Sequence, residues 1–193
     1  QKTAVMVEHF KEITQNKIKG KAKAMVVTAS RLHAVRYLQE FRNYIEKMGY
    51  TDMDVLVAFS GSLNIDEEEV TETKLNKTKD GRHISEDQLP EEFHGDNFNV
   101  LIVAEKYQTG FDEPLLHTMF VDKKLKNVKA VQTLSRLNRT CSGKKDTFIL
   151  DFVNTAEEIQ AAFAPYYEET SLDREINVNM IYDQKNKLRK YNV

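Results

Sequence analysis

Two arginines three residues apart, Arg136 and Arg139, are the side chains best suited to chemistry in this sequence. They lie in the string from Gln132 to Arg139 (QTLSRLNR), where a helix is predicted. Their spacing predicts that both guanidinium groups share one helix face, together with Gln132, four residues before Arg136. Arginine stays charged and offers a planar fork of donors, which suits the stabilisation of charge on a transferring phosphate. For the arginine pair alone, an ordinary solvated helix face is the favoured alternative.

A second candidate cluster follows the apolar run that ends at Ala104. The string EKYQTGFDEP at 105–114 comes directly after this predicted strand, and open α/β sheets bind ligands beyond the carboxyl ends of their strands. Gly110 would let the backbone approach a ligand closely. Asp112 could accept hydrogen bonds from a ribose hydroxyl or hold an arginine. A plain turn, with Pro114 as a breaker, explains the same residues.

A third cluster, Thr28-Ala29-Ser30-Arg31, ends the first predicted strand. Ser30 is placed to cap the following helix, and a hydroxyl with free amides at a helix N-terminus suits a phosphate. An ordinary helix cap explains these residues equally well.

These clusters need elements to position them, and the apolar pattern predicts an α/β fold. Strands are expected at 24–29, 53–59, 98–104, 116–121 and 147–152, and helices at 3–15, 31–48, 128–138, 154–164 and 173–190, with Pro165 between the last two. Strands alternating with helices predict a parallel sheet covered on both faces. The polar segment 61–96 is predicted to be a long loop with one short helix near 86–93.

Composition limits the class of protein. The 193 residues are 40% hydrophobic and 30% charged, with one cysteine, which indicates a globular domain without an internal disulfide. No apolar run reaches the length of a membrane span, so no membrane partner is expected. Basic residues predominate at 11–47 and 122–145, and acids at 61–96. This segregation suggests a polyanion partner, although solvated helix faces would produce it too.

A metal site is not expected. His83 and His94 lie among acids in segment 61–96, but their spacing fits no tetrahedral signature.

The three clusters resemble motifs IV, V and VI of superfamily 2 helicases in their order and spacing. The string 132–139 resembles motif VI, Q-x-x-G-R-x-x-R, with Ser135 at the glycine position, and T-G-F-D at 109–112 resembles the G-x-D core of motif V. The longer strings 106–117, 132–139 and 144–147 resemble the R (motor) subunits of type I restriction enzymes. So do the shorter strings 59–61 and 89–93, and the resemblance covers roughly residues 21–170.

This resemblance implies the second RecA-like domain of a motor, a P-loop NTPase-type sheet with helices on both faces. The domain would occupy 1–153, with an acidic insertion at 61–96, and a C-terminal helical region would begin in 154–193. Such a motor couples ATP hydrolysis to translocation along double-stranded DNA, in an enzyme that also cleaves DNA.

The resemblance also implies roles for single residues. Arg139 would be the arginine finger, and Arg136 would contact phosphate or the domain interface. The nucleotide cleft would be lined by Gly110, Asp112 and Gln132. The DNA track would be approached by Ser30, Arg31 and Thr109.

The sequence contains neither a G-x-x-x-x-G-K-[ST] phosphate loop nor a D-E-x-[HD] string. We expect both in a first RecA-like domain outside this chain. ATP and Mg²⁺ are therefore expected cofactors of the intact subunit, held only weakly by this chain, which is expected to be inactive alone.

The expected partners are double-stranded DNA, the first RecA-like domain, and modification and specificity subunits in a bacterial or archaeal cytoplasm. Two alternatives stay open. One is the C-terminal motor domain of another superfamily 2 helicase or remodeller. The other is a non-catalytic RecA-like module whose arginines bind a protein.

Overall fold

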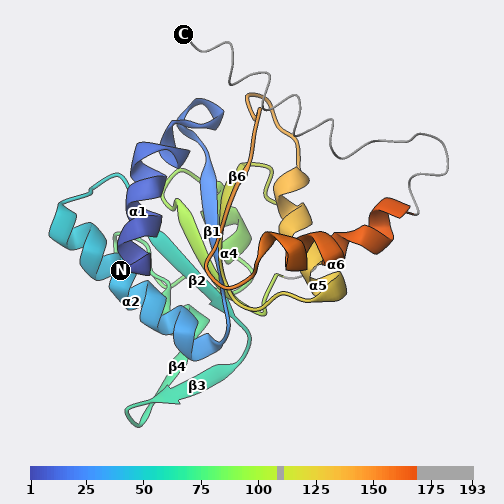
Figure 1. Ribbon diagram of the computed structural model, residues 1–193. Helices are drawn as coiled ribbons and strands as arrows, with labels where there is room; N and C mark the ends of the chain where they lie inside the picture. Colours follow the sequence, from blue (N-terminus) through green and yellow to red (C-terminus); the bar gives the residue numbers. More distant parts are fainter. Residues whose placement is uncertain (108–110, 169–193) are drawn as a thin grey trace.

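The centre of the molecule is a five-stranded, wholly parallel sheet. The structure is a computed structural model that describes residues 1–107 and 111–168 (Figure 1). The strand order is β2-β5-β1-β6-β7. The strands are β1 (Lys23–Thr28), β2 (Val55–Phe59), β5 (Val100–Ala104), β6 (Leu116–Asp122) and β7 (Phe148–Asp151).

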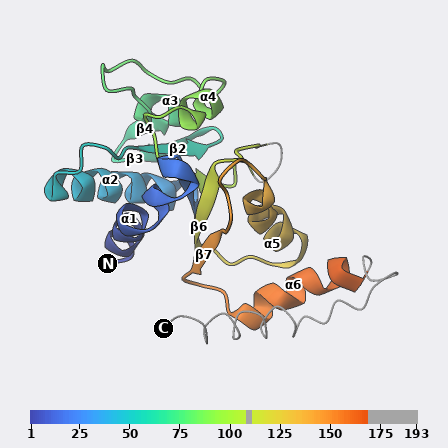
Figure 2. The same ribbon diagram turned by 90° about the horizontal axis from the view of Figure 1, so that it is seen from above.

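Helices cover both faces of the sheet, as Figures 1 and 2 show. One face carries α1 (Lys2–Glu12) and α2 (Arg31–Met48), and the other carries α4 (Leu89–His94), α5 (Asn127–Leu134) and α6 (Ala156–Glu168). Two short 3-10 turns, η1 (Thr14–Asn16) and η2 (Ile18–Gly20), lead into β1. The predicted α/β fold with helices on both faces is confirmed.

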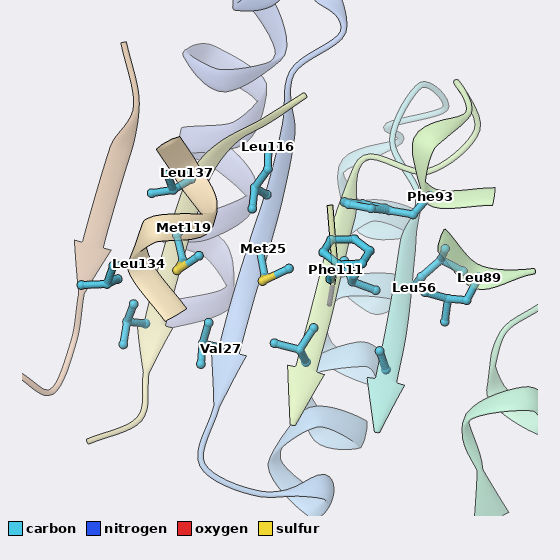
Figure 3. Packing of buried hydrophobic residues seen from close by; sticks show 14 of the residues in the cluster. Met25, Val27, Leu56, Leu89, Phe93, Phe111, Leu116, Met119, Leu134 and Leu137 are labelled. Atoms are coloured by element: carbon cyan, nitrogen blue, oxygen red, sulfur yellow. The ribbon is translucent and has the colours of Figure 1, made fainter. Parts of the chain in front are cut away.

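Burial on both faces explains why β2 and β5 are apolar throughout. Alternate residues of β1 serve two separate cores: Ala24 and Val26 face α1 and α2, whereas Met25 and Val27 face the opposite core. Figure 3 shows this second core, in which Met25 and Phe111 pack over the sheet.

The ends of α2 follow the sequence signals closely. Ser30 Oγ accepts a hydrogen bond from the His33 amide, which is N-capping geometry. Gly49 ends the helix with a φ of 69°, in the left-handed region that glycine enters without strain. Its amide donates to the Ile45 and Glu46 carbonyls.

Segment 61–96 is more ordered than its sequence predicts. It forms the antiparallel hairpin β3 (Ser62–Ile65) and β4 (Glu68–Thr71), then α3 (Glu72–Leu75) and α4. The predicted short helix is confirmed, but the predicted long loop is wrong. Three apolar side chains of the segment are fully buried against the sheet, although they are too sparse to form a periodic pattern. They are Ile84, Leu89 and Phe93.

The same segment covers the free edge of β2, the outermost strand on its side of the sheet. Asn76 is fully buried. The Val57 amide donates to Asn76 Oδ1 at 2.9 Å, and Asn76 Nδ2 donates to the Val57 carbonyl at 2.7 Å. One side chain thus replaces the two hydrogen bonds of a neighbouring strand and protects an edge that would otherwise be open to pairing.

The C-terminal helix also differs from the prediction. α6 continues from Ala156 to Glu168 and contains Pro165, so this proline does not separate two helices. A proline lacks its own amide donor, so a helix that continues past it loses the one hydrogen bond to the carbonyl four residues earlier. The helix predicted at 173–190 lies outside the described residues.

Replacing Asn76 by alanine tests its role at the sheet edge. We expect Asn76→Ala to lower the free energy of unfolding by about 3 kcal/mol, because two buried backbone groups of Val57 lose their partner. Urea unfolding of the chain measures this loss. The matched control is Asn64→Ala on exposed β3, expected to stay within about 0.5 kcal/mol of wild type. Equal losses in the two variants would contradict this role.

Candidate functional site

The α-helix predicted to carry the arginines ends before both of them. α5 ends at Leu134, a 3-10 turn spans Ser135–Asn138, and Arg139 has extended backbone angles (φ −62°, ψ 130°). Gln132 is exposed on α5, whereas Arg136 is buried. The prediction that these side chains share a face is wrong, because the α-helix ends before Arg136 and the backbone becomes extended at Arg139.

The Arg136 side chain is buried within the domain. Its Nη1 donates a hydrogen bond to the Phe111 carbonyl at 3.2 Å. Burial lowers the pKa of Arg136, and the charge of Arg139 lowers it further, but a guanidinium remains charged at neutral pH. Arg136 therefore holds the backbone of Phe111, the residue before Asp112.

Arg139 and Asp112 form an ion pair at the surface. Arg139 Nε lies 3.1 Å from Asp112 Oδ1, and the two side chains are 61% and 65% exposed. An exposed pair adds little to stability. Asp112 orients the Arg139 guanidinium but leaves most of that group accessible, as contact with a ligand requires.

This pair lies beside the amino ends of the strands. Lys144 Nζ donates to the carbonyls of both Pro114 (3.3 Å) and Arg139 (2.7 Å), and Pro114 is two residues before β6 begins. The expectation of a site beyond the carboxyl ends is therefore wrong for Asp112. The segment after β5 must cross the sheet to start the next parallel strand, and it carries Asp112 to the opposite edge.

Ser30 and Arg31 lie at the carboxyl edge instead. Ser30 Oγ caps α2 and lies 2.8 Å from His33 Nδ1. Arg31 Nη1 donates to the carbonyls of Ser60 (3.3 Å) and Ser62 (2.7 Å), which follow β2. The candidate residues thus form two groups at opposite edges of the sheet. Thr109 and Gly110 lie outside the described residues.

A cluster that sequence reasoning missed lies after β5. Lys106 Nζ is 2.9 Å from both carboxylate oxygens of Glu72 and 2.9 Å from Glu86 Oε2. Burial raises the pKa of Glu72, while the ammonium of Lys106 opposes that rise. The only sequence signal was the position of Lys106 two residues after a buried strand, because the two carboxylates come from a distant segment.

The two histidines considered for a metal site have separate partners. His83 Nδ1 lies 2.8 Å from the Thr73 carbonyl, and His94 Nδ1 lies 3.0 Å from Glu113 Oε2. Across residues 1–107 and 111–168, no group of three or more His, Cys, Asp or Glu side chains is arranged to hold a metal. No helix in these ranges is long and apolar enough to cross a membrane.

The fold is that of a RecA-like second domain of a helicase. The chain resembles domain 2 of the DEAD-box helicase Mss116p bound to an RNA duplex, with a TM-score of 0.50 and 16% identity. This match covers 78% of this chain and 47% of the Mss116p chain. The chain also resembles an HsdR fragment of a type I restriction enzyme from Vibrio vulnificus YJ016, with a TM-score of 0.52 and 16% identity, over 83% of this chain and 28% of that one.

Similarity in sequence points to a narrower group of proteins than the fold does. Residues 81–154 match the family model for type I restriction enzyme subunit R domain 3. Two Methanocaldococcus jannaschii relatives are named as type I restriction enzyme endonuclease subunits. The MjaIXP subunit is 28% identical over 179 residues, which is 93% of this chain and 16% of the relative. The MjaVIIP subunit is 32% identical over 168 residues, 83% of this chain and 15% of the relative.

A shorter match is the HindI endonuclease subunit of Haemophilus influenzae, 36% identical over 78 residues, 39% of this chain and 7% of the relative. The chain therefore spans less than a fifth of the length of these curated relatives. By sequence, it is related to one segment of the R subunits of type I restriction enzymes.

Arg136 is buried and Arg139 is exposed. Replacing each of them should therefore change the free energy of unfolding by a different amount. Arg136→Met removes the partner of a buried carbonyl and is expected to lower the free energy of unfolding by about 1–3 kcal/mol. Arg139→Ala removes an exposed ion pair and should lower it by less than about 1 kcal/mol. Urea denaturation of both variants checks this order, and an equal or larger loss for Arg139→Ala would refute it.

Proposed function

We propose that this chain is the second RecA-like domain of the motor in a type I restriction enzyme R subunit. In this role it supplies the arginine-bearing half of an ATPase cleft and part of a DNA track. The observation that carries the proposal is the exposed guanidinium of Arg139, oriented by Asp112 next to a backbone that Arg136 holds. The parent enzyme would use ATP hydrolysis to translocate double-stranded DNA before cleaving it.

The physical role of Arg139 follows from its exposure and its fixed charge. ATP and Mg²⁺ would be bound by the phosphate loop of the first RecA-like domain, and closure of the two domains would bring the guanidinium to the γ-phosphate. A supplied arginine raises the rate of such hydrolysis by about 10³–10⁵-fold. This chain alone should not hydrolyse ATP, because its sequence contains no phosphate loop.

We assign the DNA contact to the carboxyl edge of the sheet, opposite the edge that carries Arg139. The N-terminus of α2, capped by Ser30, lies there, and a helix N-terminus favours phosphate groups. Arg31 is exposed beside Ser30, with Nη1 on the Ser60 and Ser62 carbonyls. One rigid sheet would then link a nucleotide contact at one edge to a DNA contact at the other. The modification and specificity subunits would select the DNA.

Removing Arg139 from the intact parent subunit tests the catalytic assignment. We expect Arg139→Ala to lower kcat for ATP by about 10³-fold, with DNA affinity retained, because DNA is assigned to the far edge. Arg139→Lys should restore little activity, since an ammonium lacks the planar fork. ATP turnover and DNA binding are measured on the same preparations.

The matched control is Lys129→Ala, which removes an exposed positive charge from α5 and should leave kcat unchanged. Undiminished ATP turnover in Arg139→Ala would eliminate the arginine-finger role.

Arg31 offers a separate test of the DNA track. Arg31→Ala should weaken DNA binding uniformly across sequences and reduce the slope of log affinity against log salt by about 1. Lys47→Ala, at the far end of α2 and also exposed, is the control and should leave the slope unchanged. An identical salt slope in Arg31→Ala and wild type would remove Arg31 from the track.

A further inference from the structure

The ion pair between Glu72 and Lys106 joins the acidic segment 61–96 to the chain that carries the site. Glu72 is 1% exposed and Lys106 13%, whereas the second partner, Glu86, is 55% exposed. Glu72 Oε2 also accepts a hydrogen bond from the Phe59 amide at 2.8 Å. A single buried carboxylate therefore ties the carboxyl end of β2 to the second residue after β5.

The backbone on both sides of Lys106 is strained. Glu105 and Tyr107 both have a φ of 60°, in the left-handed region that is unfavourable for residues with a Cβ atom. Such conformations persist where the surrounding structure fixes them, and they are common at functional sites. The buried ion pair on the intervening side chain supplies a fixed point of this kind.

A short series of contacts leads from Lys106 to the arginines. The Tyr107 ring lies 4.6 Å from the Phe111 ring, and the Phe111 carbonyl accepts the hydrogen bond from Arg136. Lys106, Tyr107 and Arg136 also line one small pocket over β1 and β5. A displacement of Lys106 would therefore reach Arg136 through packed side chains.

We propose that Glu72 is a positioning residue for the arginine-bearing surface. By holding Lys106 it fixes Tyr107 and Phe111, and through them Arg136 and the Asp112–Arg139 pair. This role rests on the proposed function of Arg139 in ATP hydrolysis. It gives the acidic segment 61–96 a part in aligning the ATPase cleft, beyond sealing the edge of the sheet.

The experiment compares four forms of the intact parent subunit: wild type, Glu72→Gln, the double variant Glu72→Gln with Lys106→Met, and Glu86→Gln. The double variant separates positioning from stability, because removing both members of a buried pair leaves no uncompensated charge, unlike removing one. Glu86→Gln is the matched control, since it removes an exposed carboxylate from the same ammonium, and exposed pairs contribute little.

The first measurement is amide hydrogen exchange in peptides that cover 135–139, without ATP. We expect exchange about tenfold faster in both forms that lack the Glu72 carboxylate, and unchanged in Glu86→Gln. This measurement does not depend on the role of Arg139. Unchanged exchange at 135–139 in both Glu72 variants would overturn the positioning role even if Arg139 proved catalytic.

The second measurement compares Tm with kcat and KM for ATP in the same four forms. In the double variant we expect Tm to return to near wild type while kcat stays roughly 10- to 100-fold low, as for a catalytic group displaced by about 1 Å. KM for ATP and DNA affinity should be unchanged, because only an interaction made in the transition state is lost. Recovery of kcat together with Tm would show that the ion pair only stabilises the fold.

If Arg139→Ala left ATP turnover intact, the proposed function would fail by itself. Hydrogen exchange would still decide whether Glu72 positions this surface.

Discussion

The return of the chain from β5 to β6 is the constraint on which the site depends. Parallel strands start at the same edge, so the segment after Ala104 must cross one face of the sheet before β6 begins at Leu116. Arg136 holds this crossing at Phe111, and Lys106 holds its first residues. The crossing explains why the candidate nucleotide contacts and the candidate DNA contacts lie at opposite edges.

Buried polar side chains complete the sheet where another strand would otherwise be needed. Asn76 pairs with both backbone groups of Val57, and Glu72 accepts from the Phe59 amide. Buried polar groups are tolerated when they are hydrogen-bonded in this way. The segment that supplies them is the most acidic part of the chain, and its sparse apolar residues anchor it to the same core as α5 and α6.

Elements with strong local signals were predictable from the sequence. The five apolar runs are the five strands, and α2 begins after Ser30 and ends at Gly49 because a cap and a left-handed glycine act locally. The segment 61–96 was not predictable as a hairpin and two helices. Its conformation depends on Ile84, Leu89 and Phe93, which pack against a sheet formed by residues distant in the sequence.

For the candidate site, the sequence by itself determined which residue types were present and their spacing along the chain. These features support the family relationship and single out Arg136, Arg139 and Asp112. Only the tertiary structure decided that one arginine is buried on the Phe111 carbonyl while the other is exposed on Asp112. Ser135 has helical angles (φ −62°, ψ −13°), which a side chain adopts without strain in place of glycine. Spacing fixes neighbours within a helix, but burial and ion pairs between distant segments, such as Glu72 and Lys106, arise only when the chain packs.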